Sequence, residues 1–187
     1  MRIASTREMI QLALGAPYSG DSALAEMLAY LTRIQHTQNT GLVKLVIDIQ
    51  LAKIRAAVNY QRAPIPQWLF YAYGPDEVAN KASQKRLISH ILALKLHTLP
   101  ISTKKSDRLE KLCLCALEDY RLGLFRGQRL PILVYAEIMD VNADNFARDW
   151  SKYQEKALDL IKSLDSDGVG HVSVTVREIR EAELADH

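Results

Sequence analysis

The chain has 187 residues, 48% of them hydrophobic and 25% charged, a composition that belongs to folded proteins and excludes a disordered chain. At this length the protein can bury a core without disulfides or metals, as one domain or as a core with a small appendage. The formal net charge of +2 identifies no partner by itself.

Charge is distributed unevenly along the sequence. Residues 81–130 hold 11 basic and 4 acidic side chains, whereas residues 131–187 hold 6 basic and 12 acidic side chains. The chain therefore has a basic middle, residues 81–130, and an acidic end.

No segment has the pattern required for export or membrane insertion. The opening residues lack the apolar stretch and the cleavage pattern of a signal peptide, and no run approaches the roughly 18 apolar residues of a membrane span. We therefore expect a cytoplasmic protein that makes no membrane association.

Three helices are expected in the first 60 residues. The first begins near Ser5 or Thr6 and ends at Gly15, and the second follows a cap at Asp21 or Ser22. The third covers residues 42–60, either as a separate helix or as a continuation of the second. Its apolar stripe consists of Val43, Val46, Ile47, Ile54 and Val58.

An aromatic-rich segment follows two prolines. Pro64 and Pro66 interrupt the third helix, because proline lacks an N–H and restricts the residue before it. Residues 67–73 contain four aromatic side chains and are expected to form a short helix. These rings can anchor a core or stack on nucleic-acid bases, and the lack of interleaved basic residues favours the core.

Two further helices carry most of the basic middle. The first is expected to end before Pro100, and the second to begin at Ser106 or Asp107. The second ends at Gly123 or Gly127. The basic side chains form either a phosphate-binding face or ordinary solvated helix surfaces, and the sequence leaves both interpretations open. They include Lys81, Lys85, Arg86, Lys104, Lys105, Arg108 and Lys111.

The two cysteines lie within the second of these helices. Cys113 and Cys115 are two positions apart, so on a helix they point about 200° away from each other. That spacing fits neither Cys-x-x-Cys chemistry nor a zinc pair. Buried thiols in a reducing compartment are expected.

Residues 131–150 have the pattern of two short helices joined by a tight turn. Asn142 can cap the second helix, and Ala136 allows the two helices to approach closely. Val141 is expected to fill the corner. Phe146 and Trp150, four apart on the second helix, are expected to face back onto the first.

Such a helix-turn-helix would present its second helix to the major groove of DNA. Asparagine and arginine match the edges of adenine and guanine, and lysine reaches phosphates. The predicted DNA-binding residues are Asn142, Asn145, Arg148, Ser151 and Lys152. A plain or protein-binding helical pair is the alternative, because nearby carboxylates oppose a phosphate backbone. These carboxylates are Asp140, Asp144, Asp149, Glu155 and Asp159.

The C-terminal segment leaves two alternatives. Residues 165–171 are expected to form a turn, and residues 172–176 alternate valine with small polar residues. The alternating residues form either a short β-strand, for which no partner strand is identified, or part of a terminal helix that continues through Arg177 to Ala185.

The segment from Tyr135 to Trp150 resembles the helix-turn-helix of phage and prophage regulators. The chain as a whole resembles phage late-gene antitermination-type proteins, with a helical N-terminal part, the aromatic residues 68–74 and a terminal helix-turn-helix. The resemblance implies binding to DNA near promoters and contact with RNA polymerase. It carries Asn145, Arg148 and Lys152 over as recognition positions.

The sequence motifs of common enzyme and metal sites are absent. His90 and His97 are seven residues apart with no carboxylate at metalloprotease spacing, and no glycine-rich phosphate loop or nucleophile elbow occurs. Glu118 and Asp119, near Arg121, are expected on a polar turn of helix with local charge pairs. We expect no catalytic residue, no cofactor and no metal.

The sequence predicts an all-α fold of about seven helices, with a short terminal β-strand as the alternative for residues 172–176. Residues 1–130 form a helical body, and residues 131–187 hold the helix-turn-helix and a C-terminal arm. The first hypothesis for function is a phage-type transcription regulator that binds double-stranded DNA, as a homodimer or alongside RNA polymerase. The second is a helical protein-interaction or assembly module, whose acidic end meets the basic middle of a neighbouring copy. The third is a helical enzyme with scattered catalytic residues.

Overall fold

The computed structural model describes residues 5–15, 40–75, 78–97 and 103–185. Within these ranges every regular element is an α-helix, so the all-α prediction is confirmed for the described part of the chain. None of the described helices is long and apolar enough to cross a membrane. The described residues form eight helices: α1 (Thr6–Leu14), α3 (Thr40–Asn59), α4 (Ile65–Tyr73), α5 (Val78–Leu96), α6 (Thr103–Arg126), α7 (Ile132–Ile138), α8 (Ala143–Asp149) and α9 (Ser151–Ala185).

The helices group into two compact units. Unit 1 comprises Met1–Glu77 and Asp167–His187, and unit 2 comprises Val78–Ser166. The helix α9 supplies its first half to unit 2 and its second half to unit 1. The expected division into residues 1–130 and residues 131–187 remains a prediction.

In unit 1, both ends of α1 are fixed by its own sequence. Ser5 and Glu8 form a reciprocal capping box that satisfies backbone N–H groups at the start of the helix. Gly15 ends the helix in the left-handed conformation, with φ of +79°. The prediction of the first helix is confirmed at both boundaries. The predicted second helix, capped at Asp21 or Ser22, lies outside the described residues.

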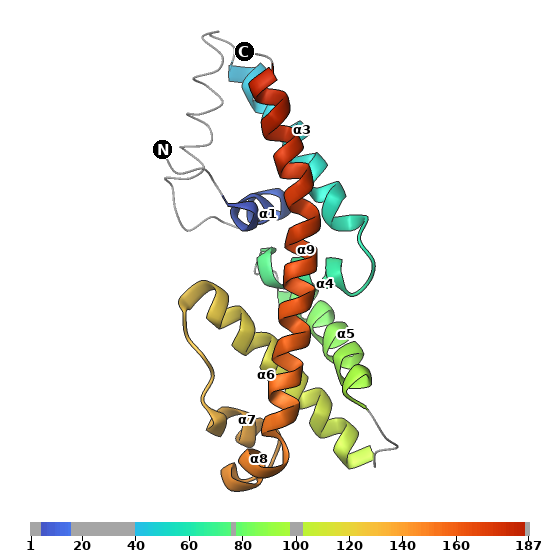
Figure 1. The fold of residues 1–187 in the computed structure, drawn as a ribbon, viewed down its shortest axis with the longest axis vertical. Helices are drawn as coiled ribbons and strands as arrows, with labels where there is room; N and C mark the ends of the chain where they lie inside the picture. The colour runs from blue at the N-terminus through green and yellow to red at the C-terminus, as the bar shows by residue number, and fades with distance from the viewer. Residues whose placement is uncertain (1–4, 16–39, 76–77, 98–102, 186–187) are drawn as a thin grey trace. The chain divides into compact units, whose positions relative to one another are not determined.

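The helix α3 packs against α1 in unit 1 (Figure 1). Ile47, Ile54 and Val58 are buried, as the predicted stripe requires, but Val46 is 37% exposed. The side chain of Arg55 donates two hydrogen bonds, of 2.8 and 2.6 Å, to the carbonyl of Ala13. A carbonyl at the C-terminal end of α1 thereby gains a partner from a different helix.

The aromatic residues of α4 form the centre of unit 1. Trp68 and Tyr73 are fully buried, and Tyr71 is nearly so. Arg7 of α1 donates a hydrogen bond of 3.0 Å to the hydroxyl of Tyr73, which keeps that buried oxygen paired. The interpretation of this segment as a core anchor is confirmed, and a base-stacking role is excluded for the buried rings.

The second half of α9 corrects two predictions. Residues 165–171 do not form a turn, and residues 172–176 do not form a strand, because α9 runs through both without a break. Val172, Val176 and Ile179 are buried at helical spacing, which places the apolar side chains on one face. The helical alternative for residues 172–176 is confirmed.

The contacts of Gly168 explain why a glycine occurs inside this helix. A Cβ atom at this position would lie 2.8 Å from a methyl group of Ile65 and 3.1 Å from one of Leu69. Gln61 donates a hydrogen bond of 3.3 Å to the carbonyl of Gly168. The glycine therefore allows α9 to pack closely against α4, and close packing outweighs the low helix propensity of glycine.

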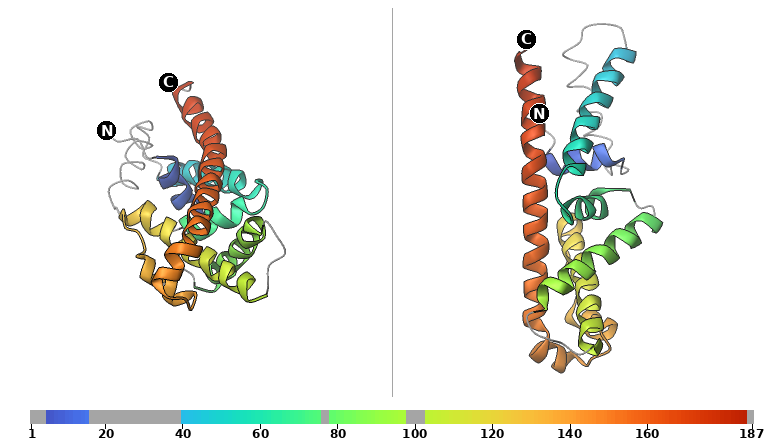
Figure 2. Two further views of the ribbon diagram at one scale, coloured as in Figure 1. Left: turned by 60° about the horizontal axis from the view of Figure 1, so that its bottom comes forward. Right: turned by 90° about the vertical axis from the view of Figure 1, so that its right-hand side faces the viewer.

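Unit 2 is built on α5 and α6, which pack against each other (Figure 2). Ile88 and Leu92 of α5 and Leu109 and Leu112 of α6 are buried in its core. The helix α5 ends before Pro100, and α6 ends at Arg126 followed by Gly127 with φ of +63°, as predicted. The predicted start of α6 is wrong, because the helix begins at Thr103 and not at Ser106 or Asp107. The hydroxyl of Ser106 instead lies 3.2 Å from the ring nitrogen of His97.

Both cysteines are buried in α6, as predicted. Burial raises the pKa of Cys113 to about 12 and that of Cys115 to about 11. Both thiols therefore remain protonated at neutral pH and act as small apolar core groups.

Alanine substitutions at the two glycines of α9 test the packing argument. Gly170 has no atom within 4 Å of an added Cβ, so Gly170→Ala should raise the free energy of unfolding by up to about 1 kcal/mol through helix propensity. Gly168→Ala should lower it by about 1 kcal/mol, because overpacking strain of about 1–3 kcal/mol exceeds that gain. Urea denaturation followed by circular dichroism measures both, and equal stabilisation by the two substitutions would contradict the close approach.

Candidate functional site

The helices α7 and α8 form a hairpin of two seven-residue helices in unit 2. Asp140 in the turn has φ of +54°, a left-handed conformation that aspartate tolerates better than most residues. The N–H of Val141 donates a 3.0 Å hydrogen bond to the carbonyl of Ala136 and closes the turn. Asn142 caps α8 by accepting a 2.7 Å hydrogen bond from the N–H of Asn145. The two helices and the turn lie where the sequence predicts them.

A small aromatic core holds the hairpin together. The rings of Tyr135 and Phe146 are 5.5 Å apart, and both side chains are fully buried. Phe146 faces the first helix as predicted. The prediction for Trp150 needs correction, because α8 ends at Asp149 and Trp150 is its C-cap residue. The Trp150 ring packs 5.7 Å from the ring of Tyr153 in the first turn of α9.

A buried carboxylate fixes the hairpin to α6. Asp119 accepts a 2.7 Å hydrogen bond from the N–H of Leu130 and a 2.9 Å hydrogen bond from the hydroxyl of Tyr135. The guanidinium of Arg129 lies 3.8 Å from the same carboxylate. The loop between α6 and α7 and the first turn of α7 are thus bound to a single charged group.

The sequence prediction for Asp119 is wrong. Its side chain is almost fully buried and does not lie on a polar helix surface. The missed signal is the helical spacing of Asp119. It follows Ala116 by three residues, Leu112 by seven and Leu109 by ten, and these three side chains are buried on one face of α6. A carboxylate in an apolar stripe needs partners, and here the partners come from the following loop and helix.

The hydroxyl of Tyr135 is kept as a hydrogen-bond donor. Burial raises the pKa of Tyr135 above its usual range, and the nearby Asp119 carboxylate raises it further. The phenol therefore stays protonated at all physiological pH values and donates to Asp119.

Removing this hydroxyl should destabilise unit 2. Tyr135→Phe keeps the ring in its contact with Phe146 and deletes the hydroxyl, which donates to the carboxylate and also hydrogen-bonds the Gln154 side chain. We expect a loss of about 1.5–3 kcal/mol in the free energy of unfolding, the usual range for a hydrogen bond to a charged group.

Thermal and urea denaturation measure this loss. Tyr60→Phe is the matched control, because Tyr60 is 86% exposed and its substitution should change stability by less than about 0.5 kcal/mol. A Tyr135→Phe protein as stable as this control would show that Asp119 does not depend on the phenol.

The predicted DNA-binding residues fall on α8 and at the start of α9. Arg148 points to solvent with 70% of its side chain exposed, and Asn142 and Lys152 are also exposed. Asn145 is half-buried, and so is Ser151, whose hydroxyl donates a 2.8 Å hydrogen bond to the carbonyl of Ala147. The structure thus places Asn145 and Arg148 on one short helix and Asn142 at the N-cap of that helix. Their part in binding remains a prediction.

Arg148 makes local contacts in this structure. Its guanidinium donates two hydrogen bonds of 2.9 Å to Asp149 and one of 3.0 Å to the side-chain oxygen of Asn145. The hydrogen bonds from Arg148 hold the pKa of Asp149 below its usual range. Exposed ion pairs of this kind are weak and exchange readily with other partners.

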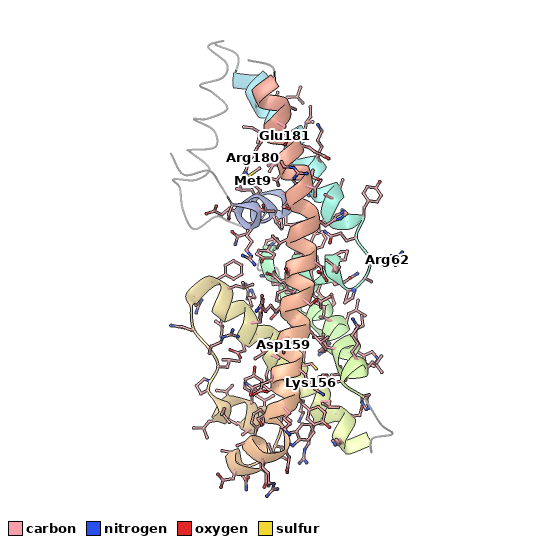
Figure 3. The ribbon with its side chains drawn as sticks, viewed as in Figure 1. Met9, Arg62, Lys156, Asp159, Arg180 and Glu181 are labelled. Atoms are coloured by element: carbon pink, nitrogen blue, oxygen red, sulfur yellow. The ribbon has the colours of Figure 1, made fainter. Side chains whose placement is uncertain are left out.

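Charges of both signs continue along the first half of α9. Lys156 and Asp159, both exposed, follow Lys152 along the helix (Figure 3). Asp144 lies in the first turn of α8, where a carboxylate interacts favourably with the helix dipole. The surface of the hairpin is therefore mixed in charge and not uniformly acidic.

Among the described residues, no group of three or more His, Cys, Asp or Glu side chains is arranged to hold a metal ion. The hairpin combines an aromatic core, a buried carboxylate anchor and an exposed arginine.

Comparison with known proteins identifies a family. Residues 24–187 match the family of phage antitermination protein Q, which covers most of the chain and the whole of the hairpin. No curated protein and no solved structure matches the chain.

Proposed function

Because the chain belongs to the phage antitermination protein Q family, we propose that it regulates phage transcription by binding duplex DNA through the hairpin of α7 and α8. This family consists of transcription regulators and not of enzymes. Antitermination acts on transcription, so the family suggests contact with nucleic acid and RNA polymerase.

The observation that carries the proposal is the orientation of Arg148. Successive residues of a helix are rotated by about 100°, so Arg148 lies on the side of α8 opposite the buried Phe146. Its side chain is 70% exposed. An α-helix fits the major groove of B-DNA, where an arginine can donate two hydrogen bonds to a guanine.

Asn145 and Asn142 supplement this contact. Asn145 is the next polar side chain toward the N-terminal end of α8, the end that makes base contacts in helix-turn-helix proteins. Asn142 contributes mainly as the cap that defines this end of the helix. Lys152, at the start of α9, is placed to reach a phosphate of the same duplex.

Binding requires Arg148 to exchange partners. In the free protein its guanidinium is paired with Asp149, and a guanine edge would replace that carboxylate in the complex. The exchange costs little free energy because the Arg148–Asp149 ion pair is exposed to solvent. Asp149 also disfavours unspecific phosphate contact at this position, which favours recognition of bases.

The test uses duplexes that the wild-type protein selects from a random-sequence library. Arg148→Ala should weaken binding to the selected duplex by about 5- to 150-fold, corresponding to the 1–3 kcal/mol of a bidentate base contact. Circular dichroism should be unchanged because the side chain is exposed. Lys162→Ala, at an exposed lysine of α9 in the same unit, is the control and should bind like the wild type.

Gel-shift measurements over a range of salt concentrations decide the outcome. The proposal predicts retardation that weakens steeply as salt rises, because phosphate contacts release counterions. If no duplex is retarded even at low salt, the proposal that this chain binds DNA is wrong.

The second candidate function is a protein-interaction module. It is favoured by the exposed apolar side chains of α7, Ile132, Leu133 and Ile138, which unit 2 leaves at least 44% accessible. These residues suit contact with a protein partner such as RNA polymerase, or with a second copy in a homodimer. Sedimentation that shows an oligomer, together with absence of DNA binding, would favour this candidate.

A further inference from the structure

The first turns of α6 lie beside the α7–α8 hairpin (Figure 2). Arg108 donates a 3.0 Å hydrogen bond to the carbonyl of Asp140 in the turn. The ammonium group of Lys105 lies 5.4 Å from the centre of the Tyr153 ring in the first turn of α9. Two contacts thus fix two cations of the basic middle at the edge of the candidate DNA-binding surface.

These cations change the electrostatics of the hairpin. Around the turn and α8, the chain itself offers three carboxylates, Asp140, Asp144 and Asp149, against Arg148 and Lys152. Lys105 and Arg108 bring the cations to four. Lys105 is near enough to Asp149 to help Arg148 lower the pKa of that carboxylate.

Four other cations of the basic middle have interaction partners elsewhere. Lys85 lies 3.5 Å from Glu118, and Arg129 lies beside Asp119. Lys81 and Arg121 also have interaction partners. Lys105 and Arg108 differ from these four because their contacts place them at the turn of the hairpin and at the start of α9.

We propose that Lys105 and Arg108 bind the phosphate backbone of duplex DNA next to the base contacts of α8. The inference rests on the proposed function, since it names the backbone contacts of the same interface. Half to two-thirds of protein–DNA hydrogen bonds go to the backbone, and the acidic α8 needs cations from another helix to supply them.

The geometry suits this role. Lys105 and Arg108 are three residues apart and therefore lie on the same side of α6. Arg108 uses one nitrogen for the carbonyl of Asp140 and keeps its remaining donors for a phosphate. Lys105 is exposed, and the face of the Tyr153 ring orients its ammonium without neutralising it.

The experiment compares full-length variants by fluorescence anisotropy on the selected duplex and on a random-sequence duplex. Lys105→Gln and the double variant Lys105→Gln, Arg108→Gln should weaken binding to both duplexes by similar factors, on the order of tenfold per contact at 0.1 M salt. The slope of log affinity against log salt should fall by about 0.9 for each contact removed. By contrast, Arg148→Ala should weaken binding mainly to the selected duplex.

The control is Arg126→Gln, at the exposed opposite end of α6, about 27 Å from Arg108 along the helix axis. It should leave both the affinity and the salt slope unchanged. Lys105→Gln alone keeps the test valid if the loss of Arg108 disturbs the turn, because Lys105 is exposed.

Two results overturn the inference, and they are distinguishable. If the wild type binds the selected duplex but Lys105→Gln and the double variant keep its affinity and salt slope, α6 makes no phosphate contact while the proposed function stands. If the wild type binds neither duplex, the proposed function fails and the inference fails with it.

Discussion

The hairpin of α7 and α8 depends on one buried charge. The carboxylate of Asp119 holds the loop after α6 through Leu130 and the first helix of the hairpin through Tyr135. A buried carboxylate without these partners would be costly, so the loop, α7 and α6 are constrained together. Because the ring of Tyr135 also packs against that of Phe146, the constraint extends to α8 and determines which of its sides faces solvent.

This constraint determines which side chains of α8 are exposed. The aromatic core fills the side of α8 that carries Phe146, so Arg148 and its neighbours are presented outward on a rigid support. Rigid presentation lowers the entropic cost of recognition. The acidic character of the C-terminal sequence suggests a surface that repels DNA. The fold, however, places cations of α6 against the turn of the hairpin and the start of α9. Net charge along the sequence therefore misrepresents the charge around the hairpin.

Local sequence signals predicted much of the fold. The start of α1 near Ser5, its end at Gly15, the buried aromatics of α4 and the tight turn between α7 and α8 all depend on neighbouring residues, and each prediction is confirmed. The errors lie where tertiary packing decides. Glycine is typical of turns, but Gly168 lies inside α9, where it allows close packing against α4. The alternating valines of residues 172–176 belong to the same helix. Asp119 resembles a surface acid because its partners lie 11 and 16 residues further along the chain. The roles of Asn145, Arg148 and Lys152 depend on a partner, which neither the sequence nor the fold contains.

Hydrogen–deuterium exchange with and without the selected duplex tests the central claim, that the anchored hairpin offers the outward face of α8 to DNA. The account predicts slower exchange on DNA binding in the segment from Asn142 to Lys152 and in the first turns of α6, with little change in α3 and α4. Protection confined to α3 and α4, or absent from α8 in a protein that binds the duplex, would contradict it.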